Sequence, residues 1–226
     1  MNTQKKLLIL FACGILPFEL NGIYNPVIIK TPALFWSMEV LTWVIIPLLI
    51  FTCGIRKNFF TAHDLGINSS ASRRLNKTTN IFLLVSLTVI VSTILPNAYD
   101  FFYHTADILF PVDYLRQNFS YHNTIPAQGN ERMCAILFYS LTAGIVEELY
   151  YRGLFWKIIE KMKYRTVIYI ISSSVIFSSV HWESGIKNLF ATFLFGALCS
   201  LIFAKFKNLW PLIIGHVVTD FLLYIN

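Results

Sequence analysis

Two neighbouring glutamates, Glu147 and Glu148, lie in the apolar stretch Met133–Tyr151, which is followed by Arg152. A carboxylate at membrane depth is costly unless it is paired or neutralised, and such groups mark reaction sites or ion paths. Residues four apart share a helix face, so we expect Glu148 to pair with Arg152. Glu147, turned about 100° away from Glu148, is then free to face the interior of the protein.

Two histidines and an aspartate recur in the later apolar stretches. His181 ends the sequence that begins at Phe177, and His216 is followed one helical turn later by Asp220. We expect the Asp220 carboxylate to hold one nitrogen of the His216 ring and to fix its tautomer. Each of these ionisable residues alone has a structural explanation, such as a salt-bridged helix end. Together they favour a reaction site or an ion path within the membrane.

Such side chains can hydrolyse an acyl bond by two routes. A buried glutamate with a neighbouring histidine can activate water as a general base, while other donors stabilise the oxyanion. Alternatively, Glu147, His181 and His216 can bind a divalent metal such as zinc, which lowers the pKa of its bound water to about 7. The sequence contains neither G-x-S-x-G nor H-E-x-x-H and leaves both routes open.

The composition is that of a membrane protein. Of the 226 residues 56% are hydrophobic and 13% charged, whereas soluble domains carry about 25% charged residues. We expect one membrane domain over residues 1–226, with spans and an outer loop in 1–132 and a four-span catalytic core in 133–226. The four cysteines lack paired or metal-ligand spacing and are interpreted as small buried hydrophobes.

Seven apolar stretches are long enough, or nearly so, to span a bilayer. Only helices and closed barrels satisfy their backbone groups in hydrocarbon, so the expected fold is an all-α, polytopic transmembrane helical bundle. The N-terminal stretch resembles a signal peptide but is interpreted as a retained span. The expected spans are Leu7–Ile23, Ala33–Cys53, Ile81–Ala98, Met133–Tyr151, Thr166–Trp182, Leu189–Ala204 and Leu209–Ile225.

The basic residues predict the orientation of these spans, because Lys and Arg collect on the cytoplasmic side. A cytoplasmic N-terminus leaves four of the 18 outside, namely Lys30, Arg116, Arg132 and Lys187. The aromatic segment Asn97–Arg132 is then the one sizeable outer loop, and 56–77 is a polar inner connector. These boundaries put Glu147 near the cytoplasmic end but His181 past the midplane, so a boundary is wrong or the site lies near mid-membrane.

Three sequence motifs resemble those of a known family. The sequence EELYYR (Glu147–Arg152) resembles its EExxxR motif, FSSVH (Phe177–His181) its FxxxH motif, and HVVTD (His216–Asp220) its HxxxN/D motif. These motifs belong to the CAAX prenyl protease and bacteriocin-processing (CPBP, or Abi) family of intramembrane endopeptidases. They occur in family order, with a plain span between the second and the third, and the resemblance covers about Met133–Asn226.

The resemblance implies that Glu147 and His181 activate the water, while His216 and position 220 stabilise the oxyanion. Where family members have Asn, its amide can donate a hydrogen bond, which an ionised Asp220 cannot do. Family members have been described both as metalloproteases and as metal-free glutamate peptidases, so the resemblance leaves the cofactor open between none and a divalent metal such as zinc. The implied supporting residues are Glu148, Arg152 and Phe177.

The leading prediction is an intramembrane endopeptidase that cuts a membrane-proximal or hydrophobic peptide or protein. The alternative is a non-catalytic immunity or scaffold protein of the same fold that binds a peptide or a partner enzyme, and a third reading is a transporter or ion path. The expected partners are a peptide or protein substrate and the lipid bilayer, with no nucleic acid. The expected location is a bacterial cell membrane.

Overall fold

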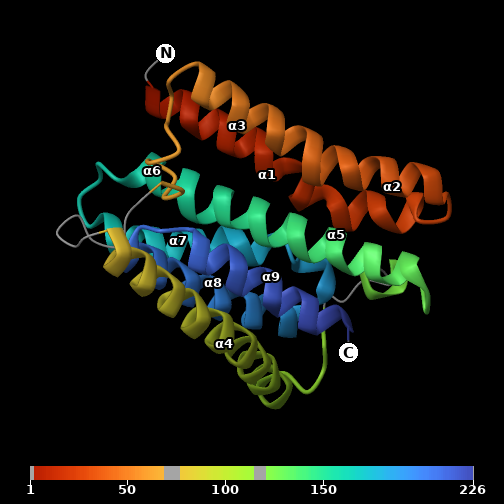
Figure 1. The fold of residues 1–226 in the computed structure, drawn as a ribbon. Coiled ribbons are helices and arrows are strands. Elements are labelled where there is room, and N and C mark those ends of the chain that lie inside the picture. The colour runs from red at the N-terminus through yellow and green to blue at the C-terminus, as the bar shows by residue number, and fades with distance from the viewer. Residues whose placement is uncertain (1–2, 69–76, 115–120, 226) are drawn as a thin grey trace.

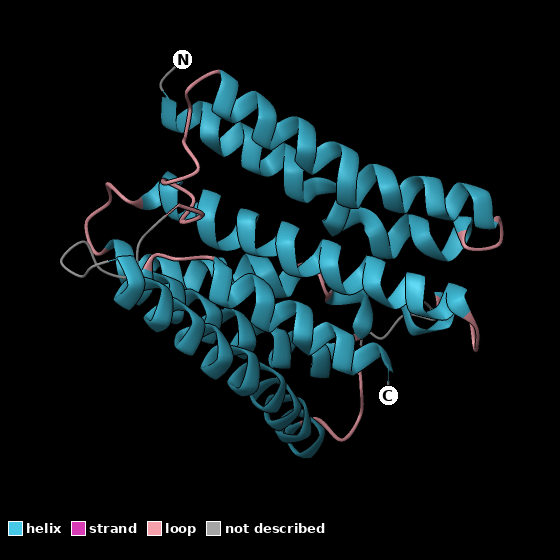
Figure 2. Ribbon diagram, in the orientation of Figure 1, coloured by secondary structure: helices cyan, strands magenta, loops and turns pink. Residues whose placement is uncertain are grey.

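A computed structural model describes residues 3–68, 77–114 and 121–225, and all regular structure in these ranges is helical (Figure 2). Five helices are long and apolar enough to cross a membrane, and two shorter apolar helices accompany them. The protein is therefore an integral membrane protein with the predicted all-α architecture. Three of the long helices are uninterrupted: α1 (Thr3–Ile28), α4 (Lys77–Leu109) and α8 (Ile186–Phe206).

Two long helices contain a π-helical segment. One consists of α2 (Pro32–Val40), a π-helical turn at Leu41–Ile45 and α3 (Ile46–Arg56), and the other of α5 (Asn130–Glu147), a π-helical segment at Glu148–Leu154 and α6 (Phe155–Ile159). The shorter helices are α7 (Arg165–Ser179) and α9 (Trp210–Ile225).

The outer surface of the bundle is apolar. Val27 of α1 and Phe82 and Ile108 of α4 expose about 70% of their area, at 71%, 70% and 71%. Such a surface has lipid as its natural solvent, since a soluble monomer rarely exposes large contiguous apolar patches. The first helix is part of the bundle, because Leu7, Phe11 and Phe18 are buried in its core.

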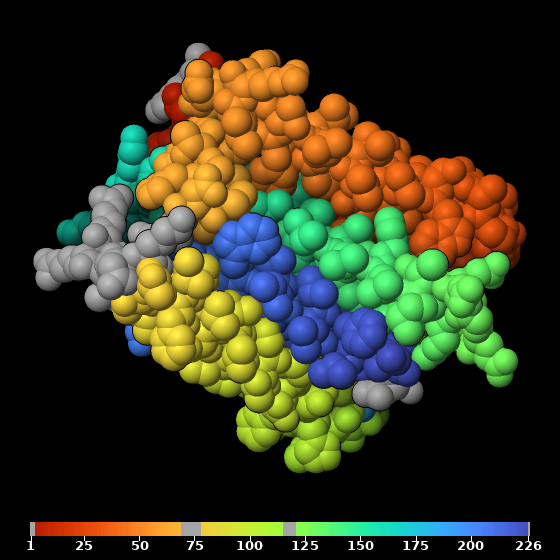
Figure 3. Space-filling model, in the orientation of Figure 1, coloured from red at the N-terminus to blue at the C-terminus, as the bar shows by residue number. Residues whose placement is uncertain are grey.

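The helices form an up-and-down bundle in which α9 packs between α4 and α5, and α8 packs between α4 and α7 (Figure 1). The surface shows α4, α9 and α5 side by side (Figure 3). Helix α1 lies against α3 and contacts the π-helical segment Glu148–Leu154 on the other side. Helix α1 begins at one end of the bundle and α9 finishes at the other (Figure 1), as expected if the five long and two shorter apolar helices all cross the membrane. That the N-terminal end is cytoplasmic stays a prediction, and Arg73, Arg74 and Arg116, which contributed to it, lie outside the described residues.

The predicted loop Asn97–Arg132 is wrong in its first third, because α4 continues to Leu109. Hydropathy falls after Pro96, which suggested an end to the span, but the helix passes through this proline. The Asn97 side chain donates to the Thr93 carbonyl oxygen at 2.8 Å and caps part of the backbone there. The fall in hydropathy marks instead the point at which α4 begins to line a cavity with polar side chains. Residues 115–120 of the predicted loop lie outside the described residues.

The predicted span Met133–Tyr151 is also too short, because the helix runs continuously from Asn130 to Ile159. Glu147 follows Asn130 by 17 residues and precedes Ile159 by 12, so it lies in the middle of this helix and not near its end. Helix α7 ends at Ser179, which places His181 directly after it. The conflict between the depths expected for Glu147 and His181 disappears, because the site lies at mid-bundle.

The four cysteines are unpaired, but the prediction that all are buried is wrong. Only Cys199 is buried; Cys53 is half-buried, and Cys13 and Cys134 are exposed. A small apolar side chain is at no disadvantage on a lipid-facing surface, so burial in the bundle is not required of it.

Candidate functional site

The two glutamates lie where an α-helix changes into a π-helix. Glu147 is the last residue of α5, and Glu148 begins the π-helical segment Glu148–Leu154. A π-turn carries one additional residue, shifts the side chains that follow it, and is frequent at functional sites. Both carboxylates are buried, with Glu147 5% and Glu148 0% exposed.

Helix α9 approaches these carboxylates closely at Gly144, one turn before Glu148. A Cβ at Gly144 would lie 2.6 Å from Val217 Cγ2 and 2.9 Å from the Val217 backbone nitrogen. Only glycine permits the two backbones to come this near. The contact brings His216, the neighbour of Val217 on α9, against the two glutamates.

The His216 ring lies between the two glutamates. Its Nδ1 is 2.9 Å from Glu148 Oε1, and because a carboxylate only accepts, Nδ1 carries the proton. Its Nε2 is 3.6 Å from Glu147 Oε2 and 3.7 Å from Asp220 Oδ1. The prediction that Asp220 fixes the tautomer is therefore corrected: Glu148, from another helix, makes the shorter bond. Glu147 and Glu148 point apart on their helix, and the two nitrogens of one imidazole bridge the gap between them.

The predicted pair of Glu148 and Arg152 forms, with Arg152 Nε 3.3 Å from Glu148 Oε2. Arg152 is completely buried, and its guanidinium carbon lies 4.3 Å from the centre of the Phe177 ring. Both Glu148 oxygens are thus occupied, one by His216 and the other by Arg152. Glu148 balances a buried positive charge and holds a histidine, which leaves Glu147 as the freer carboxylate.

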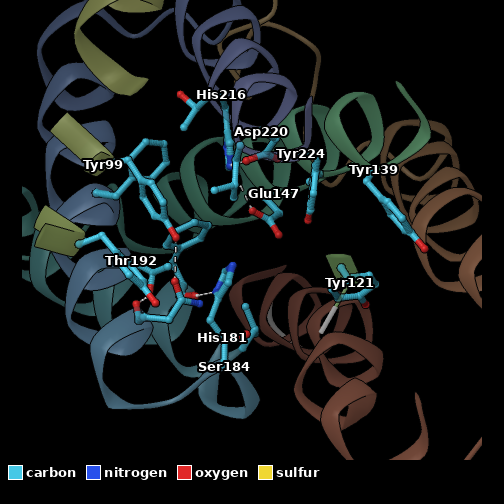
Figure 4. Close-up of a pocket in the computed structure, with 18 of the residues that line it drawn as sticks. Tyr99, Tyr121, Tyr139, Glu147, His181, Ser184, Thr192, His216, Asp220 and Tyr224 are labelled. Carbon is cyan, nitrogen blue, oxygen red and sulfur yellow. Dashed lines mark hydrogen bonds and ion pairs between the residues drawn. The ribbon is translucent and has the colours of Figure 1, made fainter. Parts of the chain in front are cut away.

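His181 follows α7 and is fixed by its own helix end. Its Nδ1 lies 2.9 Å from the Phe177 carbonyl oxygen. A carbonyl only accepts, so Nδ1 carries the proton and Nε2 keeps its lone pair. The His181 ring and the Glu147 carboxylate lie on opposite sides of one open space (Figure 4).

That space is a cavity of about 420 Å³, within the usual range for ligand sites of about 300–1,000 Å³. It brings together five of the seven predicted site residues, from three helices and the turn after α7, while Glu148 and Arg152 do not line it. Phe177 forms part of the cavity wall, between Arg152 on one side and His181 on the other. The five that line the cavity are Glu147, Phe177, His181, His216 and Asp220.

The cavity is also lined by polar groups that the motifs did not indicate. Tyr99 of α4 donates to Asn188 Oδ1 of α8 at 2.8 Å, which orients the Asn188 amide. Glu183, in the turn between α7 and α8, is only 3% exposed, and this burial raises the pKa of its carboxyl to about 7. The sequence analysis did not identify Glu183 or Asn188 as site residues. Both lie just outside predicted spans, where a polar residue is common and does not by itself indicate a site.

The donor set does not have the arrangement of a metal centre. Within residues 3–68, 77–114 and 121–225, no three His, Cys, Asp or Glu side chains are grouped so that they could hold a metal ion. His216 and His181 each direct Nδ1 to an acceptor, which leaves Nε2 of both rings available, as it is in metal-ligating histidines. The residues predicted as ligands if a metal is used, Glu147, His181 and His216, are nevertheless not grouped so that they could hold an ion in this arrangement.

Comparison with known proteins identifies one family. Residues 129–222 match the family model described as type II CAAX prenyl endopeptidase, Rce1-like. This range contains all three motifs and every residue of the site discussed above except Tyr99. No curated protein and no solved structure matches the chain.

Proposed function

From the premise that residues 129–222 are an Rce1-like CAAX prenyl endopeptidase domain, we propose that the protein is an intramembrane endopeptidase. Its substrate is a membrane-proximal or hydrophobic peptide or protein, and its nucleophile is a water molecule activated by Glu147 and His181. The observation that carries the proposal is the unequal use of two adjacent glutamates. Glu148 is occupied on both oxygens, whereas Glu147 faces the cavity. That the membrane is a bacterial cell membrane stays a prediction.

In this mechanism Glu147 is the general base. A water between Glu147 and the unprotonated Nε2 of His181 loses a proton to the carboxylate as its oxygen attacks the peptide carbonyl. The protonated Glu147 then delivers that proton to the departing amine, so that the carboxylate is restored. General bases of this kind contribute a factor of about 10²–10⁴ to the rate.

The oxyanion that forms in the attack needs donors. His216 is held by Glu148 through Nδ1, and in its protonated form it presents an Nε2–H toward the cavity beside Glu147. Asp220 lacks an amide, but Asn188 lines the same cavity and has one. Because its Oδ1 accepts from Tyr99, its Nδ2 is directed away from that bond. We assign His216 and Asn188 as the donors that stabilise the oxyanion.

The experiment that tests the proposal is cleavage of a library of membrane-proximal peptides by the purified protein in detergent. Glu147→Gln is nearly isosteric and removes only the base, so cleavage should fall by about 10²–10⁴-fold while the protein stays folded. Glu131→Gln is the matched control, because Glu131 is exposed at the start of the same helix, and should cleave normally. Normal cleavage by Glu147→Gln would refute the assignment of the base.

The same assay with a strong chelator tests the metal-free route. The mechanism written here uses no metal, so it predicts that cleavage survives chelation. If chelation abolishes cleavage and zinc restores it, the mechanism written here is wrong. If neither the intact protein nor any variant cleaves a peptide of the library, the non-catalytic alternative replaces the proposal.

A further inference from the structure

We infer that substrate reaches Glu147 from only one end of the bundle, the end with few basic residues, and is presented from the non-cytoplasmic side of the membrane. The substrate class is an exported or membrane-anchored peptide whose scissile segment lies at that face. The statement about substrate rests on the proposed function, but the statement about the side on which the cavity opens does not.

The two ends of the bundle are defined by contacts between distant segments. At one end, Lys157 Nζ lies 2.9 Å from Asp64 Oδ1, and the Leu209 backbone N–H donates to the Gly66 carbonyl oxygen at 3.1 Å. At the other end, Lys187 Nζ lies 2.7 Å from Asp107 Oδ1. Helices α1, α4 and α9 begin at the first end and finish at the second (Figure 1).

Basic residues of the described chain collect at the first end, which we call the basic end. They are Lys5, Lys6, Arg56, Lys57, Lys157, Lys161, Lys163, Arg165, Lys205 and Lys207. The second end has Lys30, Arg132 and Lys187, and Arg152 is buried between the two. Lys and Arg favour the cytoplasmic side of a membrane, so the basic end is the cytoplasmic one.

The cavity opens at the second end, which we call the mouth. Three exposed residues of α4, Asp100, His104 and Asp107, line it at spacings of four and three, and so follow one face of the helix. This part of α4 lies beyond the expected span. The turn between α7 and α8 contributes Glu183, and the last turn of α9 contributes Tyr224.

The basic end of the site is closed by packed side chains. Tyr150, Tyr151, Leu154 and Leu212 are each 0% exposed. None of them lines the cavity, and they fill the space between the glutamates and the basic end together with the buried Arg152. Cores of this density leave few voids larger than a water molecule, so a peptide cannot approach Glu147 from that end.

Labelling of single cysteines in sealed vesicles of known orientation tests which side the mouth faces. The full chain carries Cys13→Ser, Cys53→Ser and Cys134→Ser, while the buried Cys199 is kept. His104→Cys reports the mouth, and Lys163→Cys, exposed between α6 and α7, is the matched control at the basic end. A membrane-impermeant maleimide should label His104→Cys in right-side-out vesicles and Lys163→Cys only in inverted ones. The opposite pattern, or labelling of both variants from one side, overturns the inference.

Peptide cleavage by oriented vesicles is the second test of the access route. A peptide that the detergent assay has shown to be cut is attached to a large hydrophilic carrier and added outside sealed vesicles. Right-side-out vesicles should cleave it, and inverted vesicles should cleave it only after permeabilisation. Cleavage by intact inverted vesicles refutes the access route although the enzyme is active. An absence of cleavage in detergent refutes the proposed function, while the labelling result still decides the side.

Discussion

The close approach of α5 and α9 at Gly144 predicts that one methyl group there disables the site. In Gly144→Ala the new Cβ would lie 2.9 Å from the Val217 backbone nitrogen, whereas ordinary contact begins at 3.4 Å, so α9 must move by about 0.5 Å. The Val217 side chain can rotate, but its backbone cannot yield without moving its neighbour His216. Added volume in a packed site costs about 1–3 kcal/mol of stability.

The displacement acts directly on the bond between His216 Nδ1 and Glu148 Oε1. Adding about 0.5 Å to its 2.9 Å takes it past the usual hydrogen-bond range of about 2.7–3.2 Å. A misplacement of about 1 Å at a reacting centre can cost about 10²-fold in rate. We therefore expect kcat of Gly144→Ala to fall by about 10-fold or more while the protein still folds.

The matched control is Gly215→Ala, which adds the same methyl group beside His216 on the other face of α9. There the Cβ would meet the side-chain methyl groups of Leu95 and Val91 at 3.0 Å and no backbone atom nearer than 3.4 Å, so the strain falls on side chains of α4 and not on the backbone that carries His216. Peptide cleavage and thermal unfolding in detergent are measured for both variants. Full activity in Gly144→Ala, or equal loss in Gly215→Ala, would refute the argument that backbone contact positions His216.

Three more substitutions test other parts of the site. Arg152→Met should lower the free energy of unfolding by about 3–5 kcal/mol, because it leaves the Glu148 charge buried without its partner. The double variant Arg152→Met with Glu148→Gln should recover folding but not cleavage. A thermal melt in which the double variant is less stable than Arg152→Met alone would contradict the pairing. Asn188→Leu should lower kcat by about 10²-fold with little change in KM, since an oxyanion donor acts in the transition state. Tyr99→Phe removes the bond that orients Asn188 but keeps the amide, so it should cost less; an unchanged kcat in Asn188→Leu would refute the assignment. Burial raises the pKa of Glu183 from 4.5 to about 7, so its contribution to folding stability should fall as pH rises from below 4.5 through 7, by on the order of 3 kcal/mol. Glu183→Gln should therefore make the fall of melting temperature with pH smaller, whereas the exposed Glu131→Gln should leave it as it is; an unchanged fall in Glu183→Gln would contradict the argument.

The motifs and the hydropathy pattern predicted the helical class and the five residues that share a cavity. Both predictions depend on local sequence alone. A long apolar run in lipid forms a helix, because its backbone groups must be hydrogen-bonded internally. An ionisable group within such a run is costly to bury and is therefore usually functional. The pairing of Glu148 with Arg152 was predictable for the same reason, because it depends only on a spacing of four along one helix.

The bond between Glu148 and His216 could not be predicted, because it joins residues 68 apart and depends on how closely α9 approaches Gly144. The predicted span lengths were wrong where polar residues continue a helix, as they do in the last part of α4. Asp100 and His104 look like loop residues by hydropathy, but they continue α4, and their side chains line a cavity. Hydropathy reports the surroundings of a side chain and not the end of its helix.

The need for two adjacent glutamates follows from their unequal partners. One carboxylate has two oxygens, and at Glu148 Oε1 holds His216 while Oε2 balances the buried Arg152. A proton taken up by Glu148 would weaken both contacts at the moment of reaction. A base that exchanges protons with water must therefore be a second carboxylate, one that contacts the same histidine more loosely, as Glu147 does at 3.6 Å. The start of a π-helical segment between the two residues lets one remain in the bundle core while the other borders the cavity.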